Sequence, residues 1–577
     1  MRVPEPRGVF AASTAFALCL GGASGVSAQS TVPNHKHYEE SPQAAQPGPS
    51  GELAPRLLNL GSHTFPVSTK SKKAQSFMNQ GLNLTYGFNH AEAGRAYREA
   101  ARLDPSCAMA YWGQALVLGP NINAPMDAAN EPQALALAQK AVSLKGKASP
   151  REQALIDALA ERYSGKTEDR AARDKAYAAA MKKVVARFPG DLDIATLYVE
   201  SVMDLRPWGY WMPDNTPYAG TEEIVALTES VIRRNPKHLG ALHLYIHLME
   251  PTTRPEAAEA AADALLPLAP GAGHLVHMAS HIYQRVGRYA DSVKSNQDAA
   301  LSDEAYITQC RAQGFYPMAY YPHNVHFIWF AATMDGRGQL AVDSARKVAG
   351  KVTDEALKEL PLLAGFRVVP YYALARFGRW DEVLAEPAPP AGNLFMEGIW
   401  HYARGLAFVA KGQTGEAEAE LGQVRRIAAD KKLEFPLFSP NLGSTIFAIA
   451  PEVLAGELAA ARKDWNAAIG HFERAVRLED GLVYTEPSEW HYPPRHALGA
   501  VLLQAGRARE AETVYWEDLK KNRENGWALF GLARAMEAQG RTEQAALVRA
   551  RFEKAWARAD VKLEASRILG PAVADED

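Results

Sequence analysis

Cysteine is scarce in this sequence, which has 3 cysteines among 577 residues. Cys19 lies in an N-terminal apolar segment, so only Cys107 and Cys310 remain in the body of the chain. Two cysteines so far apart do not frame a disulfide-stabilised domain, and the sequence leaves open whether folding brings them together. A C-x-x-C pair, a glycine-rich phosphate loop and a G-x-S-x-G elbow are also absent, so the usual signatures of dithiol redox proteins, nucleotide-binding proteins and serine hydrolases are missing.

The sequence also lacks an excess of positive charge and long apolar runs. It has 63 basic and 66 acidic residues, a formal net charge of -3, and the two signs are interspersed. DNA and RNA binding require clustered lysine and arginine, so no nucleic-acid partner is expected. Beyond the N-terminal segment no run reaches the ~18 apolar residues of a membrane helix, so we expect a soluble protein without a membrane span.

Residues 1–28 have the features of a cleavable export signal. Arg2 and Arg7 precede an apolar run from Val9 to Leu20, and Val26-Ser27-Ala28 matches an A-x-A-like cleavage site. This order of charge, apolar run and small residues is typical of secreted proteins. It predicts a periplasmic or secreted protein.

Residues 29–66 have a different composition, rich in Pro, Gly, Ser and Gln. Such low-complexity polar segments usually cannot bury enough apolar surface to fold. We therefore expect a flexible N-terminal arm, in which His35, His37 and His63 are solvated.

Helical segments follow one another from about residue 72 onward, with turn residues between them and no alternating strand pattern. The first pair of segments matches the consensus W-x2-L-G-x2-Y…A-x3-F…P of a known helical unit, and later segments end in glycine, which ends a helix in the left-handed conformation. The matching residues of the first unit are Phe77, Gly81, Ala93, Tyr97, Ala100 and Pro105, and the closing glycines include Gly287, Gly336, Gly378, Gly506 and Gly540.

On these residues the chain resembles the tetratricopeptide repeat family across residues 72–560. The resemblance implies an all-α fold, a right-handed solenoid of stacked helical hairpins, which we place at residues 67–570. In this family the first helices of the hairpins line a concave groove that most often binds peptides and proteins. Fold does not decide function, so the function has to be argued from particular side chains.

Histidines recur at the repeat period in residues 236–287. His243 and His277, like His247 and His281, are 34 residues apart, so the same positions of one helix carry histidine in two successive units. The resemblance places positions 2, 5, 9 and 12 of each first helix in one stripe facing the groove. The residues on such positions within 236–330 are His243, His247, Glu250, His274, His277, His281, His323 and His326.

Imidazoles and a carboxylate from three neighbouring helices predict a transition-metal site in this groove. Histidines four residues apart on a helix converge on one metal in helical zinc sites, although the H-E-x-x-H motif itself is absent. The donor set is rich in nitrogen and has no thiolate, which favours copper, zinc, iron or nickel over calcium or magnesium. It suffices for one metal or for two. Glu250 is the candidate ligand or general base if the metal is catalytic.

Other residues near the stripe are candidates for contact with a bound molecule. Glu200 and His238 lie toward the groove on the preceding helix and turn, and Tyr372 occupies a groove position of a later unit, so these three are predicted to bind substrate. Packing between helices is the alternative for Tyr372. A second, separate feature several units away contains Trp490, His491 and His496.

Three functions are compatible with this pattern, and the sequence does not decide whether the protein is an enzyme. A metal-dependent oxidoreductase or hydrolase would leave a coordination position open beside a pocket. A scaffold would bind a peptide or a small acidic ligand through hydrogen-bonding or pH-sensitive histidines. A metal storage or delivery protein would saturate its histidines and have no substrate pocket.

Overall fold

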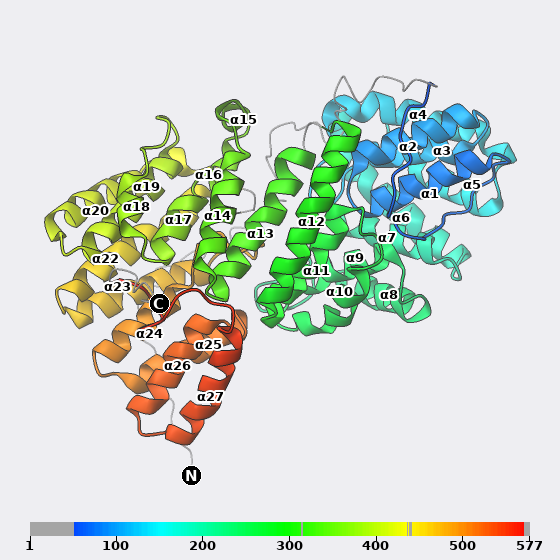
Figure 1. Ribbon diagram of the computed structural model, residues 1–577. Coiled ribbons are helices and arrows are strands. Elements are labelled where there is room, and N and C mark those ends of the chain that lie inside the picture. The colour runs from blue at the N-terminus through cyan, green and yellow to red at the C-terminus, as the bar shows by residue number, and fades with distance from the viewer. Residues whose placement is uncertain (1–50, 313–315, 436, 438–440, 570–577) are drawn as a thin grey trace, which may run out of the picture.

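A computed structural model describes residues 51–312, 316–435, 437 and 441–569 (Figure 1). The predicted export signal, residues 1–28, and the first part of the predicted arm lie outside the described residues. The described chain consists of helices and connecting turns, and its only β pairing is two isolated bridges, Asn121 with Ala124 and Trp211 with Pro217. The prediction of an all-α fold is therefore confirmed.

Consecutive helices pack against each other as hairpins, and the hairpins stack side by side along the chain (Figure 1). The first part of the stack contains α1 (Lys72–Tyr86), α2 (His90–Leu103), α3 (Ala108–Leu118), α4 (Glu131–Leu144), α5 (Pro150–Ala160), α6 (Arg170–Arg187), α7 (Leu192–Met203), α8 (Thr221–Arg234), α9 (Leu239–Met249), α10 (Glu259–Leu265), α11 (Gly273–Val286) and α12 (Tyr289–Cys310). The second part contains α13 (Tyr321–Met334), α14 (Gly338–Gly350), α15 (Asp354–Glu359), α16 (Ala364–Arg367), α17 (Val369–Arg376), α18 (Trp380–Ala385), α19 (Leu394–Ala410), α20 (Thr414–Ala428), α21 (Gly443–Phe447), α22 (Ile449–Ala461), α23 (Trp465–Asp480), α24 (Pro494–Gln504), α25 (Ala508–Lys521), α26 (Gly526–Ala538) and α27 (Thr542–Ala555).

Glycines let neighbouring helices of the stack approach closely. Gly81 on α1 and Gly113 on α3 lie on either side of the buried Tyr97 ring of α2, and a Cβ atom would lie 2.4 Å from that ring at Gly81 and 2.5 Å at Gly113. The small residue that the repeat consensus requires at Gly81 therefore makes room for an aromatic ring. The same arrangement recurs near the C-terminus, where Tyr515 lies between Gly499 and Gly531.

The C-terminal helices fold back onto the middle of the chain (Figure 1). The Trp527 indole on α26 donates to the Thr333 carbonyl on α13 at 2.8 Å. The segment between α23 and α24, residues 481–493, reaches further and places the Tyr484 hydroxyl 2.9 Å from the Glu250 carboxylate. The predicted groove is therefore covered by the chain's own C-terminal half, whereas the repeat family suggested an open concave surface.

The described part of the N-terminal arm does not extend freely from the helices. The Asn83 side chain on α1 donates to the Leu60 carbonyl at 3.0 Å. His63, which the composition predicted to be solvated, lies 2.9 Å from the Asp193 carboxylate on α7. The composition of the segment could not predict these contacts, because isolated side chains and backbone groups make them and no periodic apolar pattern accompanies them.

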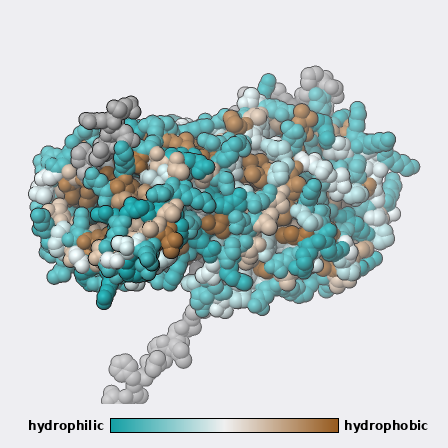
Figure 2. Space-filling view, turned by 60° about the horizontal axis from the view of Figure 1, so that its bottom comes forward, coloured by the Kyte–Doolittle hydropathy of each residue, from teal (hydrophilic) through white to brown (hydrophobic). Residues whose placement is uncertain are grey.

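One described helical stretch, Gly443–Ala461, has the length and apolar composition of a membrane span, and 61% of it lies inside the molecule. Buried core helices meet the same two criteria, so this stretch is weak evidence for a span. Figure 2 shows a face on which hydrophilic side chains predominate and hydrophobic ones form small separate patches.

The packing around Tyr97 predicts that Gly113→Ala destabilises the first hairpins. The added methyl group would have to displace the Tyr97 ring, and overpacking of this kind costs about 1–3 kcal/mol, against a gain of about 1 kcal/mol in helix propensity. The midpoint of thermal unfolding should therefore fall. Gly146→Ala is the matched control, because no atom lies within 4 Å of a Cβ atom there. Equal midpoints for the two variants would contradict this account of the packing.

Candidate metal centre

The predicted ligands lie on three neighbouring helices. α9 carries His243 and His247 and is followed directly by Glu250, α11 carries His274, His277 and His281, and α13 carries His323 and His326. The five histidines of α9 and α11 are at most 2% exposed. Burying imidazoles costs free energy unless their nitrogens find partners, so the question is what each nitrogen contacts.

Six of the seven histidines form two sets of three, and within each set one ligand nitrogen per histidine lies within 4.8 Å of the other two. The first set is His243, His247 and His274, and the second set is His277, His281 and His323. α11 lies between α9 and α13 and contributes to both sets. The repeat period that aligns the histidines in the sequence thus places two sites side by side.

Two of these histidines donate Nδ1–H to an acceptor outside the sets. His243 Nδ1 lies 2.6 Å from the carbonyl of Tyr86, the last residue of α1, which helix geometry leaves without an intrahelical partner. His277 Nδ1 lies 2.6 Å from Oδ1 of Asn296, whose amide nitrogen donates to the Ser292 carbonyl and so fixes which end of the amide faces the imidazole. Because each acceptor requires the proton on Nδ1, Nε2 keeps its lone pair.

Glu250 holds one histidine of each set. Its Oε1 accepts from His247 Nδ1 at 2.8 Å, and its Oε2 accepts from His281 Nδ1 at 2.8 Å. The Tyr484 hydroxyl also donates to Oε2, at 2.9 Å, and the Arg285 guanidinium donates to the Glu250 backbone carbonyl at 3.0 Å. Burial opposes ionisation, but His281 and His247 hold the pKa of Glu250 well below its usual range. Glu250 thus bridges two imidazoles, and with His247, His281 and Glu486 it also forms a group whose ligand atoms lie within 4.8 Å of one another, so its prediction as a metal ligand stays a prediction.

The four anchored rings face each other through Nε2. His243 Nε2 is 3.1 Å from His247 Nε2, and His277 Nε2 is 2.7 Å from His281 Nε2. With the proton on Nδ1 of both rings, the neutral pair His243 and His247 has no proton to place between its Nε2 atoms, so two lone pairs oppose each other. Glu250 and Glu486 raise the pKa of His281 to about 10, so without a metal this ring also carries a proton on Nε2, which it donates to His277. A metal ion removes this conflict, because two nitrogen ligands at about 2.0–2.1 Å from a tetrahedral ion are about 3.3 Å apart.

His274 and His323 are the third members of the sets. His274 is 2% exposed, and neither of its ring nitrogens has a hydrogen-bond partner among the described residues. Buried polar groups are normally paired, so this ring marks a missing partner. Burial, together with the neighbouring imidazoles, lowers the pKa of His274 well below its usual value, which leaves a neutral ring with a free lone pair. The His323 ring lies 4.9 Å from the His277 ring and is partly exposed to a cavity.

One phenylalanine packs against each set. The Phe88 ring lies 4.5 Å, 6.0 Å and 5.6 Å from the three rings of the first set. The Phe327 ring lies 4.6 Å, 4.9 Å and 4.9 Å from the three rings of the second set. These apolar faces keep water away and hold the imidazoles in place, and the low local dielectric strengthens any charge interaction there.

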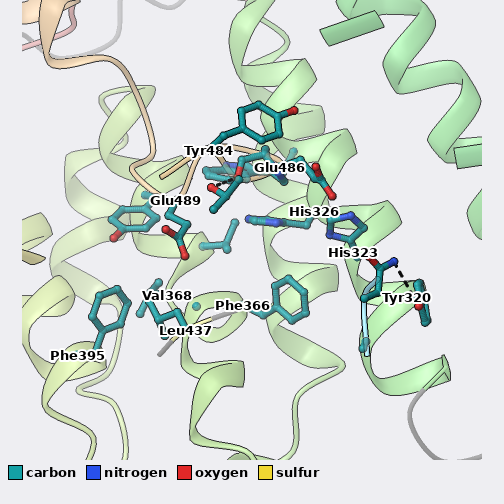
Figure 3. A pocket seen from close by; sticks show the side chains of 18 of the residues that line it. Tyr320, His323, His326, Phe366, Val368, Phe395, Leu437, Tyr484, Glu486 and Glu489 are labelled. Carbon is teal, nitrogen blue, oxygen red and sulfur yellow. Dashed lines mark hydrogen bonds between the residues drawn. The ribbon is translucent and has the colours of Figure 1, made fainter. Parts of the chain in front are cut away.

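A cavity of about 200 Å³ opens beside the second set (Figure 3). His323 and Glu486 lie in its wall, and most of the remaining wall is aromatic or aliphatic. Trp208 connects the cavity to the first set as well, because its ring lies 5.1 Å from the His247 ring. The other aromatic side chains of the wall include Tyr320, Trp329, Phe366, Tyr372 and Phe395. A small molecule in this cavity would lie against the His323 imidazole.

Two predicted histidines lie outside both sets. His326 stacks on Trp329 with ring centroids 5.0 Å apart and lines the cavity, and burial lowers the pKa of His326 to about 3. His238 caps α9 through Nδ1, which accepts from the Ala241 amide at 3.2 Å. Its Nε2 faces Asp193 Oδ1 at 3.3 Å, and His63, Asp193 and His238 form a further group whose ligand atoms lie within 4.8 Å of one another.

Of the three predicted substrate contacts, the structure brings only Tyr372 to the cavity. Glu200 lines a separate, small buried chamber together with His90 and Asp204. Burial, followed by the charge of Asp204, raises the pKa of Glu200 to about 8, and burial lowers the pKa of His90 to about 4. Both groups are therefore uncharged at neutral pH.

The most important residues that the sequence did not indicate lie in the segment 481–493. The sequence treats Trp490, His491 and His496 as a separate feature, but His491 stacks at 4.3 Å on Tyr372, which lines the main cavity. Tyr484 of the same segment reaches Glu250 across 234 positions of sequence. No repeat period or motif connects such distant positions, so only the fold reveals the contact.

Comparisons with known proteins add no function. No family model and no curated protein matches the chain. Among solved structures, the human IFIT1 dimer with m7Gppp-AAAA is 12% identical with a TM-score of 0.30, and the alignment covers 84% of this chain and 90% of that chain. The crystal structure of the APC/C hetero-tetramer Cut9-Hcn1 is 13% identical with a TM-score of 0.29, covering 80% of this chain and 76% of that chain. Similarity at this level carries no argument about ligands.

The buried chamber predicts acid sensitivity. The pKa of His90 is about 4 in the folded protein and about 6.5 when unfolded, so the unfolded state takes up a proton first as the pH falls. The contribution of neutral His90 to the stability of the fold is complete above pH 6.5 and is lost toward pH 4. From this source the free energy of unfolding falls by about 2 kcal/mol between pH 7 and pH 5. His90→Gln should therefore lose less stability over this interval in urea unfolding. Identical pH profiles for the variant and the unmodified protein would contradict the prediction.

Proposed function

We propose that this protein is a metalloenzyme whose active centre binds two metal ions, one in each set of three histidines. The observation that carries the proposal is that four Nε2 atoms face each other in pairs, at 3.1 Å and 2.7 Å, while all four Nδ1 atoms are engaged elsewhere. An acceptor on the far nitrogen of a metal-binding histidine is the usual way in which proteins fix its tautomer and orientation. The partnerless ring of His274 supports the same conclusion.

Copper is the metal that the donor set favours. Each set offers three imidazole nitrogens and no thiolate, and the carboxylate of Glu250 already accepts hydrogen bonds from two imidazoles. Imidazole ligands suit copper, and among divalent first-row metals the affinity for such a site is highest for Cu²⁺. Zinc is the second candidate, because three histidines with an open fourth position also form catalytic zinc sites.

Catalysis is favoured over storage by the cavity at His323. Three protein ligands per metal leave a coordination position open, and the aromatic cavity gives a small molecule access to it. A copper pair, when bound, supplies two one-electron carriers, which suits oxidation of an organic molecule with dioxygen as the electron acceptor. A zinc pair would instead suit hydrolysis. The peptide-scaffold alternative has less support, because the chain covers the groove.

On the N-terminal signal pattern we further propose that the protein is exported to the periplasm or secreted. Export matters for the metal, because a protein that folds outside the cytoplasm acquires its ions from a different pool. Production with the native signal is therefore the appropriate starting point for metal analysis.

Elemental analysis of the purified protein is expected to find about two transition-metal ions per chain, with copper predominant. His274→Ala and His323→Ala each remove one ligand from a different set, so each variant should retain about one ion. His471→Ala is the matched control, because His471 lies outside both sets and pairs with Glu452 at 2.7 Å. A metal-free protein of unchanged stability, or equal metal content in all three variants, would overturn the two-metal centre.

Glu250→Gln tests the bridge between the sets. A glutamine has only one oxygen to accept a proton from an imidazole, so one of the two histidines loses its orientation. Loss of such an outer partner typically lowers metal affinity about 10–100-fold, which competition with a chelator of known affinity can measure. Glu452→Gln, at a histidine-carboxylate pair outside the centre, should leave the affinity unchanged. Unchanged affinity in Glu250→Gln would show that Glu250 does not support the ligands.

A further inference from the structure

The wall of the cavity beside the second set offers no carboxylate or basic side chain to pair with a charged ligand. No lysine or arginine is found among the described residues of the wall, and its two glutamates are engaged by the protein. Glu489 accepts a hydrogen bond from the Asn441 side chain at 2.7 Å and has a further partner within the chain. Glu486 faces His281 Nδ1 at 3.5 Å, and burial, followed by the charge of Glu250, raises the pKa of Glu486 well above its usual range. Neither glutamate is therefore available as a counter-charge.

His326 is a polar side chain of the wall that belongs to neither set of histidines. It is partly exposed and lines the cavity, its ring stacks on Trp329 with centroids 5.0 Å apart, and the Phe366 ring lies 5.3 Å away at 72°. Burial lowers the pKa of His326 to about 3, and no hydrogen bond or charge among the described residues contributes to this shift. A neutral imidazole has one N–H donor and one acceptor nitrogen, so His326 can offer both to a bound molecule.

His326 lies one helical turn after His323 on α13 (Figure 3). Residues three apart on a helix are neighbours on one face, and both imidazoles line the cavity. His323 belongs to the second set, whereas His326 lies outside both sets. A molecule that hydrogen-bonds to His326 would therefore lie next to the His323 ring.

The size and the lining of the cavity fit one aromatic ring. A dry apolar cavity of about 150 Å³ binds benzene, so about 200 Å³ leaves room for a ring with a short substituent. Most of the wall is aromatic or aliphatic, and Trp208, Phe366, Tyr372 and Phe395 are among its aromatic side chains. Aromatic rings prefer offset or edge-to-face contacts with each other, which a wall of this kind can provide.

We propose that the cavity binds a small, uncharged aromatic molecule whose polar group hydrogen-bonds to His326. The ring would displace water from the apolar wall, which is favourable in proportion to the apolar area buried. The polar group would pair with an imidazole that makes no hydrogen bond among the described residues. The inference rests on the proposed function in taking this molecule as the substrate of the metal centre.

Other ligand classes fit the same wall less well. A cation would find both glutamates engaged, an anion would find no lysine or arginine in the described wall, and burying a charge without a partner is costly. A hydrocarbon would fill the cavity but leave the nitrogens of His326 without a hydrogen bond. A peptide would need an open groove, which the segment 481–493 covers.

Calorimetric titration of the full mature chain, in metal-loaded and metal-free form, tests the proposal with four probes that share one ring. The probes are 2-phenylethanol, ethylbenzene, 2-phenylethylamine and phenylacetate. At pH 7 the alcohol should bind at least about 10-fold more tightly than the amine or the carboxylate, because each charged group would be buried without a partner. A charged probe that binds as tightly as the alcohol, in either form of the protein, would overturn the proposal.

His326→Phe locates the polar contact, because it keeps an aromatic ring and removes both nitrogens. The affinity for 2-phenylethanol should fall about 5-fold through the loss of one neutral hydrogen bond, whereas ethylbenzene should bind at least as tightly as before. His471→Phe is the matched control, because His471 pairs with Glu452 outside the cavity, and it should leave both affinities unchanged. An unchanged affinity for the alcohol in His326→Phe, or an equal loss for both probes, would contradict the proposal. If this variant does not fold, the ranking of the four probes with the unmodified chain decides.

Elemental analysis of the titrated protein separates this proposal from the metal centre. A preference for the alcohol over both charged probes in a chain that binds no metal would support the ligand class while refuting the proposed enzyme function. Two bound ions per chain without this preference would support the metal centre and refute the ligand class.

Discussion

The centre depends on where four imidazole protons are held. His243, His247, His277 and His281 each place Nδ1 against a fixed acceptor, at 2.6 Å or 2.8 Å, and so turn Nε2 inward. The acceptors have different origins: a carbonyl at the end of α1, an asparagine of α12 and one carboxylate shared by two rings. If these protons moved to Nε2, two N–H groups would face each other in each pair and no lone pair would be available to a cation. These acceptors therefore determine which ring nitrogens face inward.

This arrangement requires a closed molecule. Glu250 is buried and charged, which is tolerable only because two imidazoles and the Tyr484 hydroxyl satisfy its oxygens. Tyr484 belongs to the segment 481–493, so the far half of the chain completes the environment of the centre. The same segment brings Glu486 and Glu489 to the cavity. The solenoid thus buries its own groove, and a surface that repeat proteins commonly leave open for a partner becomes an interior site.

The sequence could indicate the helices and the stripe of histidines, because both follow from periodicities of the helix and of the repeat. It could not divide the histidines into two sets, since the position of His274 relative to His243 depends on how α11 packs against α9. It also placed His326 with the ligands, whereas that ring stacks on Trp329. The role of Glu250 was ambiguous for a related reason: ligand, base and bridge require the same residue type, and only its distances to two Nδ1 atoms distinguish them. Contacts from the segment 481–493 have no sequence signature at all.

Helix geometry explains why His274 and His281 could not bind the same ion. His274 and His281 are seven residues apart on α11, which corresponds to about 10 Å along the helix axis at 1.5 Å per residue. Two ligands of one ion lie much closer than this, since each is about 2 Å from the metal. The stripe must therefore be divided, with His274 turned toward α9 and His281 toward α13. A carboxylate spans only a few ångströms, yet Glu250 reaches both groups because it binds His247 and His281, whose rings are 5.5 Å apart. One side chain thereby connects a histidine of the first set with a histidine of the second.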